Sequence, residues 1–312
     1  MSDNNKSHAS TPGKRFMRLA GMTASITGKV MSNSMKSLIG SPEQKAEARS
    51  DMYHEIGKQI ATTLGEMKGA VMKVGQIASQ YQDIFPPEIA AAMTKLQKEA
   101  PPMPFNIIEQ QIIHELGAKP HEKFAEFEEK PFAAASIGQV HRARLHSGED
   151  VIVKVQYPGV DECCESDLKH LRMALKLAGV IKLSKELQEK LFDEIRTSLH
   201  AELDYLQEAA NLAEFRAFHA HDAKVIIPQV FNDYSSRRVL TLSYEGGDGL
   251  NAARHYPAHI RNEIGERLFH VLCEQMYHLH ALHCDSHPGN FAFRPDGSLV
   301  IYDFGCIKRL SP

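Results

Sequence analysis

The stretch HCDSHPGN (residues 283–290), followed by YDFG (residues 302–305), decides how this sequence is interpreted. Asp285 lies in a predicted loop, where its carboxylate can accept the proton of an attacking hydroxyl group. Asn290 and Asp303 supply one amide oxygen and one carboxylate oxygen. These are hard ligands, which Mg²⁺ accepts when phosphate oxygens complete its shell. The three residues together predict a site for phosphoryl transfer or hydrolysis on a nucleotide.

A loop aspartate, an asparagine five residues later and a DFG aspartate are typical of the catalytic half of a protein-kinase-like phosphotransferase. The predicted fold class is therefore α+β, a kinase-like two-lobed fold with an N-terminal helical extension. The sequence ends seven residues after Gly305, so we expect the C-terminal lobe to be incomplete.

The overall composition is that of an ordinary globular protein, with 43% hydrophobic and 24% charged residues. A formal net charge of −3 gives no electrostatic argument for nucleic acid as a partner. The five cysteines show no CxxC spacing and are expected to be reduced, intracellular thiols. No apolar run approaches the roughly 18–20 residues that span a bilayer, so any membrane contact is expected to be peripheral.

The first 42 residues differ from the rest in charge, since residues 4–42 contain lysine and arginine but no acidic side chain. On a helical projection one apolar stripe appears, made of Phe16, Leu19, Met22, Ile26 and Val30. One interpretation is a helix that lies on an anionic membrane surface. A disordered basic tail and an organellar targeting peptide remain open alternatives.

Hydrophobic periodicity predicts the order of the elements. Helices are expected over residues 43–83, 88–99, 106–116, 161–179, 184–220 and 261–282. A strand, hairpin and strand are expected over 132–160, and further strands over 225–230, 239–244 and 300–302. The predicted domains are a basic tail (1–42), an N-terminal helical extension (43–120), a kinase-like N-lobe (121–244) and a partial C-lobe (245–312).

Lys154 stands in VIVKV, a predicted buried strand in which a lysine needs an anionic partner. In kinases such a strand lysine contacts the nucleotide phosphates and pairs with a helix glutamate. Three glutamates of the 184–220 helix are candidates, and spacing does not choose among Glu194, Glu202 and Glu208. The alternative is an edge-strand lysine that points to solvent.

The loop before this strand is AAASIGQV rather than the glycine-rich GxGxxG. Alanine still allows the backbone to approach phosphates closely, but it disfavours the positive φ angles that glycine permits. We therefore expect a stiffer nucleotide lid, with ATP contacted by Ala133, Ala134, Ala135 and Ser136.

Four histidines near the catalytic motif raise the alternative of zinc, namely His278, His280, His283 and His287. Zinc needs three or four convergent ligands, and the kinase-like motif already accounts for the loop. We expect His283 to make a hydrogen bond that orients the loop, and the neighbouring Cys284 and Cys306 to be packed small residues.

Six motifs in a fixed order resemble the UbiB family of atypical kinases, which act in ubiquinone (coenzyme Q) biosynthesis. They are KVGQ (73–76), AAASIGQVHRA (133–143), VIVKVQYPGV (151–160), AELDYLQEAANL (201–212), HCDSHPGN and DFG. The resemblance covers roughly residues 50–310 and implies the fold predicted above.

The resemblance also implies roles for particular residues. The KxGQ motif, here Lys73, Gly75 and Gln76, would lie on the N-terminal extension and cover the nucleotide site. Its partner is the ExD motif, here Glu202 and Asp204. The later Glu208 would pair with Lys154.

By the same resemblance, the expected cofactors are ATP and Mg²⁺. The expected activity is that of an ATPase, or of a phosphotransferase with a small or lipid-related acceptor, in support of ubiquinone biosynthesis. Ubiquinone-biosynthesis proteins or intermediates are possible partners. The protein would lie in the cytoplasm at the bacterial inner membrane, or on the matrix side in mitochondria.

Two other functions stay open. One is a non-catalytic, nucleotide-gated scaffold or lipid-binding partner. The other is a small-molecule phosphotransferase of the aminoglycoside or choline kinase type. Those enzymes lack KxGQ and the alanine-rich loop, so the sequence argues against the second function.

Overall fold

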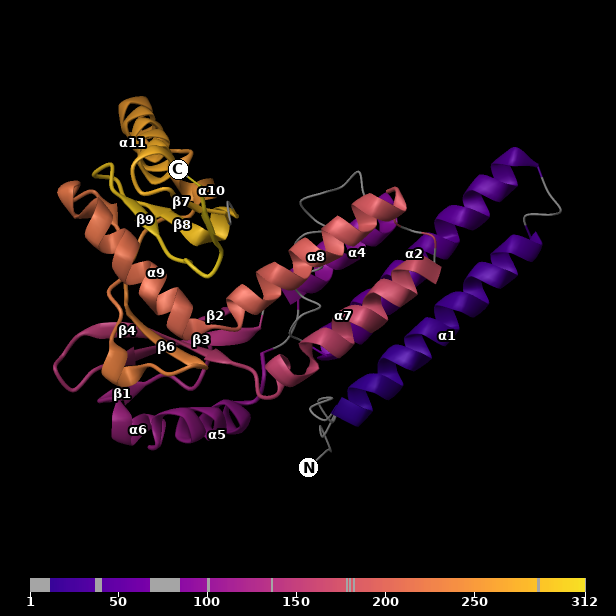
Figure 1. Cartoon of the computed structure of the whole chain (residues 1–312), viewed down its shortest axis with the longest axis horizontal. Coiled ribbons are helices and arrows are strands. Elements are labelled where there is room, and N and C mark those ends of the chain that lie inside the picture. Colours follow the sequence, from indigo (N-terminus) through magenta and orange to yellow (C-terminus); the bar gives the residue numbers. More distant parts are fainter. Residues whose placement is uncertain are drawn as a thin grey trace. The chain divides into compact units, whose positions relative to one another are not determined.

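The computed structural model describes residues 12–36, 41–67, 85–99, 102–135, 137–177, 179, 181, 183–284 and 287–311 (Figure 1). Its contacts divide the chain into two compact units that are not continuous in sequence. Unit 1 comprises Met1–Pro104, Ala134–Gly138 and Tyr157–Leu199. Unit 2 comprises Phe105–Ala133, Gln139–Gln156 and His200–Pro312. The predicted domain division at residues 43, 121 and 245 stays a prediction.

Unit 1 is built from helices. They are α1 (Pro12–Lys36), α2 (Pro42–Met67), α4 (Pro87–Glu99), α7 (Val160–Leu177) and α8 (Lys185–Glu202), whose last residues belong to unit 2. Gly57 allows α2 and α4 to pack closely, because a Cβ atom there would lie 3.1 Å from the Glu88 carbonyl oxygen. Within the described residues, no helix is long and apolar enough to cross a bilayer.

The apolar stripe of α1 packs inside unit 1. Leu19 and Ile26 are 0% exposed and Met22 is 2% exposed, because α1 lies against α2 and α7. The interpretation of this stripe as a membrane-facing surface is therefore wrong for these three side chains. Burial against neighbouring helices stabilises them in the same way as a membrane would. Of the predicted stripe, Phe16 remains exposed, at 49%.

Unit 2 begins with α5 (Phe105–Leu116) and α6 (Pro120–Lys123), followed by an antiparallel sheet. The strand order is β1 (Glu126–Phe127), β3 (Gly138–Arg144), β4 (Asp150–Gln156) and β6 (Val239–Ser243), with β2 (Ala133–Ala134) also paired to β3. Helix α5 contacts strands β4 and β6 of this sheet. Lys154 stands on β4 opposite Leu240 of β6, and its neighbours Val153 and Val155 are 0% exposed. The strand that carries Lys154 is thus anchored in the core by the buried side chains on either side of it.

The remainder of unit 2 contains α9 (Tyr205–Phe218), α10 (Leu250–Ala253), α11 (Ala258–Tyr277) and three 3₁₀ turns, η1 (His219–His221), η2 (Asn232–Tyr234) and η3 (Pro288–Asn290). One small sheet has the order β5 (Val225–Ile226), β9 (Leu299–Ile301), β8 (Phe291–Phe293). The other pairs β7 (Ala281–His283) with β10 (Ile307–Arg309).

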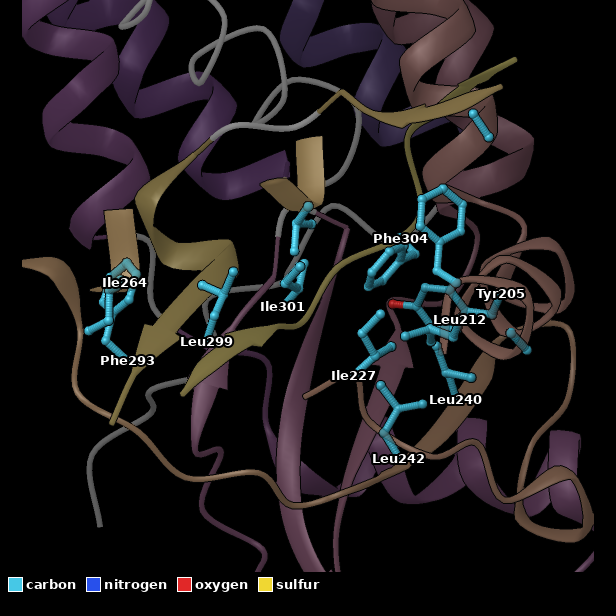
Figure 2. Packing of buried hydrophobic residues seen from close by; sticks show 14 of the residues in the cluster. Tyr205, Leu212, Ile227, Leu240, Leu242, Ile264, Phe293, Leu299, Ile301 and Phe304 are labelled. Atoms are coloured by element: carbon cyan, nitrogen blue, oxygen red, sulfur yellow. The ribbon is translucent and has the colours of Figure 1, made fainter. Parts of the chain in front are cut away.

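One hydrophobic cluster joins these elements (Figure 2). Leu212 of α9, Leu240 of β6 and Leu299 of β9 are all 0% exposed in it, together with Phe304 of DFG. Because α9, β6 and β9 share this core, the catalytic motif is anchored to the strand and the helix beside it.

Two predicted helices are interrupted. The 184–220 helix divides after α8, and Asp204 becomes the N-cap of α9 by accepting a hydrogen bond from the Gln207 amide at 3.0 Å. The predicted 261–282 helix ends at Tyr277, and the chain then turns into β7 through His280, which adopts a positive φ of 51°. The prediction of one continuous helix is wrong for 184–220, and the predicted end of the 261–282 helix is wrong.

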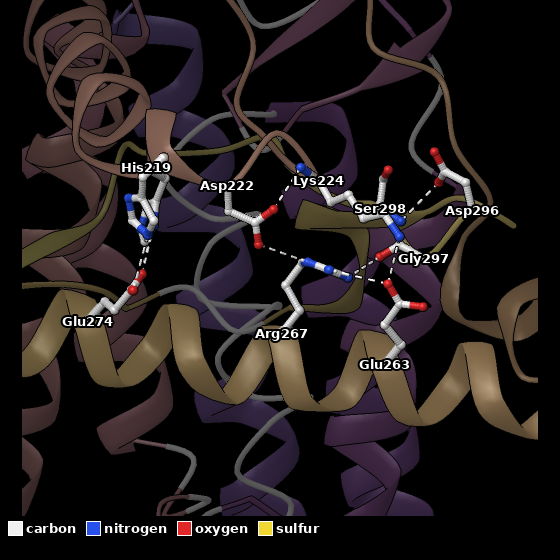
Figure 3. A network of polar contacts seen from close by, with 10 residues as sticks. His219, Asp222, Lys224, Glu263, Arg267, Glu274, Asp296, Gly297 and Ser298 are labelled. Carbon is white, nitrogen blue, oxygen red and sulfur yellow. Dashed lines mark hydrogen bonds and ion pairs between the residues drawn. The ribbon is translucent and has the colours of Figure 1, made fainter.

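Arg267 of α11 fixes that helix to the segments around β5 and β9 (Figure 3). Its guanidinium donates to Asp222 at 3.0 Å and to the Gly297 carbonyl at 2.5 Å. Glu263, one turn earlier on α11, accepts a hydrogen bond from Lys224 at 2.7 Å. This network secures the β8–β9 hairpin, whose ends lead to Asn290 and to Asp303.

Candidate nucleotide site

Three charged side chains meet in unit 2. The Lys154 ammonium lies 2.7 and 3.0 Å from the two carboxylate oxygens of Glu208 and 3.4 Å from Asp303 Oδ2. The side chain of Glu208 is 2% exposed, that of Lys154 12% and that of Asp303 33%. Glu208 on α9 is thus the glutamate that pairs with the strand lysine, as the family resemblance implied and as spacing alone had left open. The most exposed of the three, Asp303, is the one that a metal ion could reach.

Burial and charge oppose each other in this cluster. Burial alone would lower the pKa of Lys154, but the carboxylates of Asp303 and Glu208 hold that pKa well above its usual value. Burial raises the pKa of Glu208 to about 7, with Asp303 adding to the rise and Lys154 opposing it. Two carboxylates therefore share one ammonium, and the cluster carries an excess negative charge when both are ionised. A cation beside Asp303 would relieve that excess.

The DFG segment is held by α9. The Asp303 carboxylate accepts a hydrogen bond from the Gly305 amide at 3.0 Å, which turns the chain locally. Phe304 is 0% exposed and its ring lies 4.9 Å from that of Phe215. Asn211 donates to the Phe304 carbonyl at 2.9 Å. The helix that supplies Glu208 also orients Asp303.

The β8–β9 hairpin positions Asn290. The Asn290 carbonyl accepts a hydrogen bond from the amide of Tyr302, the residue before Asp303, at 2.9 Å. The His283 ring makes a short hydrogen bond to the Asp303 carbonyl. His287 accepts from the Gly289 amide at 3.1 Å. Both imidazoles thus contact the backbone of the catalytic segments.

Several predicted site residues lie outside the described residues. They are Asp285, Ser136 and the KxGQ residues Lys73, Gly75 and Gln76. Of the alanine-rich loop, Ala133 and Ala134 form the exposed strand β2, and the Ala135 amide donates to the Gly138 carbonyl at 3.0 Å. Glu202 is the last residue of α8, and Asp204 caps α9. The roles of these residues stay predictions.

Sequence reasoning missed three residues of the site, Tyr205, Asn211 and Phe215. The Tyr205 ring lies 5.2 Å from the Lys154 ammonium, and its buried hydroxyl has no hydrogen-bond partner among the described residues. All three stand three or seven residues from Glu208 on α9. That helical spacing was the available signal, since positions three or seven apart share a face.

The donor set suits Mg²⁺ bound together with nucleotide phosphates. Within the described part of the chain, no three His, Cys, Asp or Glu side chains gather so as to hold a metal ion by themselves. Magnesium in nucleotide sites needs only one or two protein oxygens, because phosphates and water complete the octahedral shell. Asp303 and Asn290 can supply those oxygens, with Lys154 placed to receive phosphate charge.

A strand lysine paired with a buried helix glutamate, next to a DFG aspartate, is typical of a protein-kinase-like fold. The chain belongs to the ABC1 (UbiB) family of atypical kinase-like proteins, because the ABC1 atypical kinase-like domain matches residues 95–312. This confirms the family and the α+β kinase-like fold predicted from the sequence.

Individual relatives agree with this assignment. The chain is 31% identical to the mitochondrial atypical kinase COQ8 of Saccharomyces cerevisiae, over 96% of this chain and 60% of that protein. It is 34% identical to the chloroplastic Protein ACTIVITY OF BC1 COMPLEX KINASE 7 of Arabidopsis thaliana, over 87% of this chain and 39% of that protein. The chain therefore spans less than two thirds of the length of these relatives.

A solved structure is also similar. Rv3197 of Mycobacterium tuberculosis, in complex with erythromycin, matches with a TM-score of 0.57 and 34% identity. The match covers 85% of this chain and 68% of that chain.

Proposed function

We propose that this chain is an atypical kinase-like protein that binds Mg·ATP in unit 2 and hydrolyses it, or transfers its phosphoryl group to a small or lipid-related acceptor. The observation that carries the proposal is the contact of Lys154 with both Glu208 and Asp303. A lysine in a buried strand that also faces a partly exposed aspartate is arranged to hold phosphate next to a metal.

Each residue then has a distinct task. Lys154 would hold phosphate oxygens, and Glu208 would keep its ammonium in place. Asp303 and Asn290 would hold Mg²⁺, while Asp285 would accept the proton of the acceptor hydroxyl or orient the attacking water. When bound, Mg²⁺ neutralises the charge that develops on the phosphoryl oxygens.

Support for ubiquinone biosynthesis is the finer part of the proposal, and it rests on the family and on the resemblance to COQ8. We expect cells that carry Asp303→Asn in place of the wild-type protein to contain less ubiquinone. Hydrolysis should be measured with and without anionic vesicles, because the family resemblance implies a location at a membrane.

The decisive experiment is a thermal-shift titration with Mg·ATP and Mg·ADP on the wild type and on Asp303→Asn. At 100 times its dissociation constant, a ligand should stabilise the protein by about 2.7 kcal/mol. We expect a Mg²⁺-dependent shift in the wild type that is lost in the variant. Asp233→Asn, on the exposed turn η2, is the matched control and should behave as the wild type.

No shift in the wild type, or an unchanged shift in Asp303→Asn, would contradict the proposed nucleotide site. A shift without ATP hydrolysis or phosphoryl transfer would support the alternative of a nucleotide-gated scaffold. Turnover that Asp303→Asn leaves unchanged would also refute the proposed role of the DFG aspartate.

A further inference from the structure

Two cysteines stand directly opposite each other where the motifs of the site meet. In the β7–β10 ladder His283 pairs with Ile307, and the next step of the same register sets Cys284 against Cys306. The Cys284 amide donates to the Cys306 carbonyl at 3.0 Å, which holds the two residues together one position beyond the ends of the strands. The pairing comes from the tertiary fold, because 22 positions separate the two cysteines in the sequence.

The Cα separation of such a pair falls within the range that a disulfide requires, whereas the Cβ separation lies slightly above it. Opposite residues of a hydrogen-bonded antiparallel pair have Cα atoms about 5.5 Å apart, and disulfides bridge Cα atoms about 4.4–6.8 Å apart. The Cβ atoms of such a pair are about 4.5–5.5 Å apart, slightly more than the roughly 3.5–4.5 Å of a disulfide. A bond here would draw the strands together, and bonds under such strain are the more easily reduced ones.

Cys284 is the most exposed of the five cysteines, while Cys306 and Cys273 are both partly exposed. Cys163 and Cys164 are buried in α7. In the reduced protein the Cys284 thiol donates to the Leu282 carbonyl at 3.4 Å. An oxidant in solution can therefore reach Cys284.

We propose that Cys284 and Cys306 form a covalent modification site, a reversible disulfide made by a peroxide. One thiol attacks a peroxide oxygen of H₂O₂, whose O–O bond breaks, giving a sulfenic acid and one water. The second thiol attacks that sulfur and displaces the hydroxyl as another water, with the two thiol protons ending in the waters. Both sulfurs are oxidised, the peroxide is reduced, and a dithiol reductant reverses the change.

The bond would couple redox state to the catalytic motifs. Cys284 precedes Asp285 in the sequence and Cys306 follows Gly305 of DFG, so one S–S bond would tie the two motifs together. A shift of about 1 Å in catalytic groups can slow a reaction by about 100-fold. We therefore expect the oxidised protein to turn over ATP at least about tenfold more slowly. This consequence rests on the proposed function, whereas the disulfide itself does not.

The test is peptide mapping by mass spectrometry of the full chain, without reduction, after treatment with H₂O₂. We expect a cross-linked peptide joining Cys284 to Cys306 that disappears on treatment with dithiothreitol. It should be absent from Cys284→Ser and from Cys306→Ser, and present in the control Cys273→Ser. Oxidation of Cys284 to sulfinic acid without a cross-link, or a cross-link to another cysteine, would overturn the site.

ATP turnover is measured on the same samples. A drop that dithiothreitol reverses in the wild type, and that is absent from Cys306→Ser, supports the regulatory consequence. A disulfide that forms while turnover stays unchanged overturns that consequence. If the reduced protein does not turn over ATP, the proposed function fails, and the mass measurement still decides the modification site.

Discussion

Replacing Lys154 with methionine tests how much the charged cluster contributes to folding stability, independently of any ligand. Methionine preserves most of the side-chain volume but removes the ammonium that contacts Glu208 at 2.7 Å and Asp303 at 3.4 Å. The carboxylate of Glu208, 2% exposed, is then left without its counter-charge. Removing one partner of a buried ion pair typically costs about 3–5 kcal/mol. Because Asp303 is 33% exposed, we expect the lower end, about 3 kcal/mol near pH 8.

The cost should depend on pH in a defined direction. A carboxyl group can have a higher pKa in the folded protein than in the unfolded chain. Its contribution to stability is then complete below the unfolded-state pKa and is lost as the pH rises through the folded-state pKa. For Glu208 in the wild type this loss of stability extends from about pH 4.5 to about pH 7. In Lys154→Met the pKa of Glu208 should rise further, because Lys154 is the group that lowers it. The variant therefore continues to lose stability above pH 7. The difference in unfolding free energy between the variant and the wild type should widen by up to about 1.4 kcal/mol per pH unit.

The assay is urea unfolding at pH 6, 7 and 8 for the wild type, Lys154→Met, Glu208→Gln and the double variant. A double-mutant cycle isolates the coupling between the two side chains. We expect the double variant to be more stable at pH 8 than Lys154→Met alone, and to lose the extra pH dependence. Equal destabilisation at pH 6 and pH 8, together with no recovery in the double variant, would refute this account of the cluster.

Two further predictions concern single side chains of unit 2. Tyr205→Phe should leave the protein as stable as the wild type or more stable by about 1 kcal/mol, because the buried Tyr205 hydroxyl has no hydrogen-bond partner among the described residues and an unpaired buried hydroxyl costs about 1–3 kcal/mol. Urea unfolding measures this stability, and a loss of more than about 1 kcal/mol would show that the hydroxyl has a partner. Gly247→Ala should destabilise the protein by about 1–3 kcal/mol, because the new Cβ atom would lie 2.9 Å from the Cβ atom of Ala292. In the control Gly249→Ala the new Cβ atom meets no other atom within 4 Å. Equal melting temperatures for the two variants would contradict the close approach at Gly247.

The chemistry of the site was largely predictable from the sequence. A lysine between valines in a buried strand demands an anion, and an aspartate in DFG indicates a metal ligand. Helical spacing did not select the partner of the lysine, because a single continuous helix over 184–220 left Glu194, Glu202 and Glu208 open, and only the family resemblance pointed to Glu208. The break at Asp204 starts a new helix, α9, and the contacts of that helix select Glu208.

The apolar stripe of α1 shows the opposite case. Its helical spacing was predictable, but the same spacing suits a membrane surface or a neighbouring helix, and packing against α2 and α7 settles the question. Periodicity reports which side chains avoid water. It does not report what covers them.

The sequence by itself determined the family, the order of the motifs and the chemical type of each candidate ligand, because these depend on residue identity and local spacing. Only the tertiary structure decided that both carboxylate oxygens of Glu208 contact Lys154, that burial brings the pKa of Glu208 to about 7, and that Cys284 lies opposite Cys306. The physical reason is that each of these facts depends on contacts between segments distant in the chain, and on the water those contacts exclude.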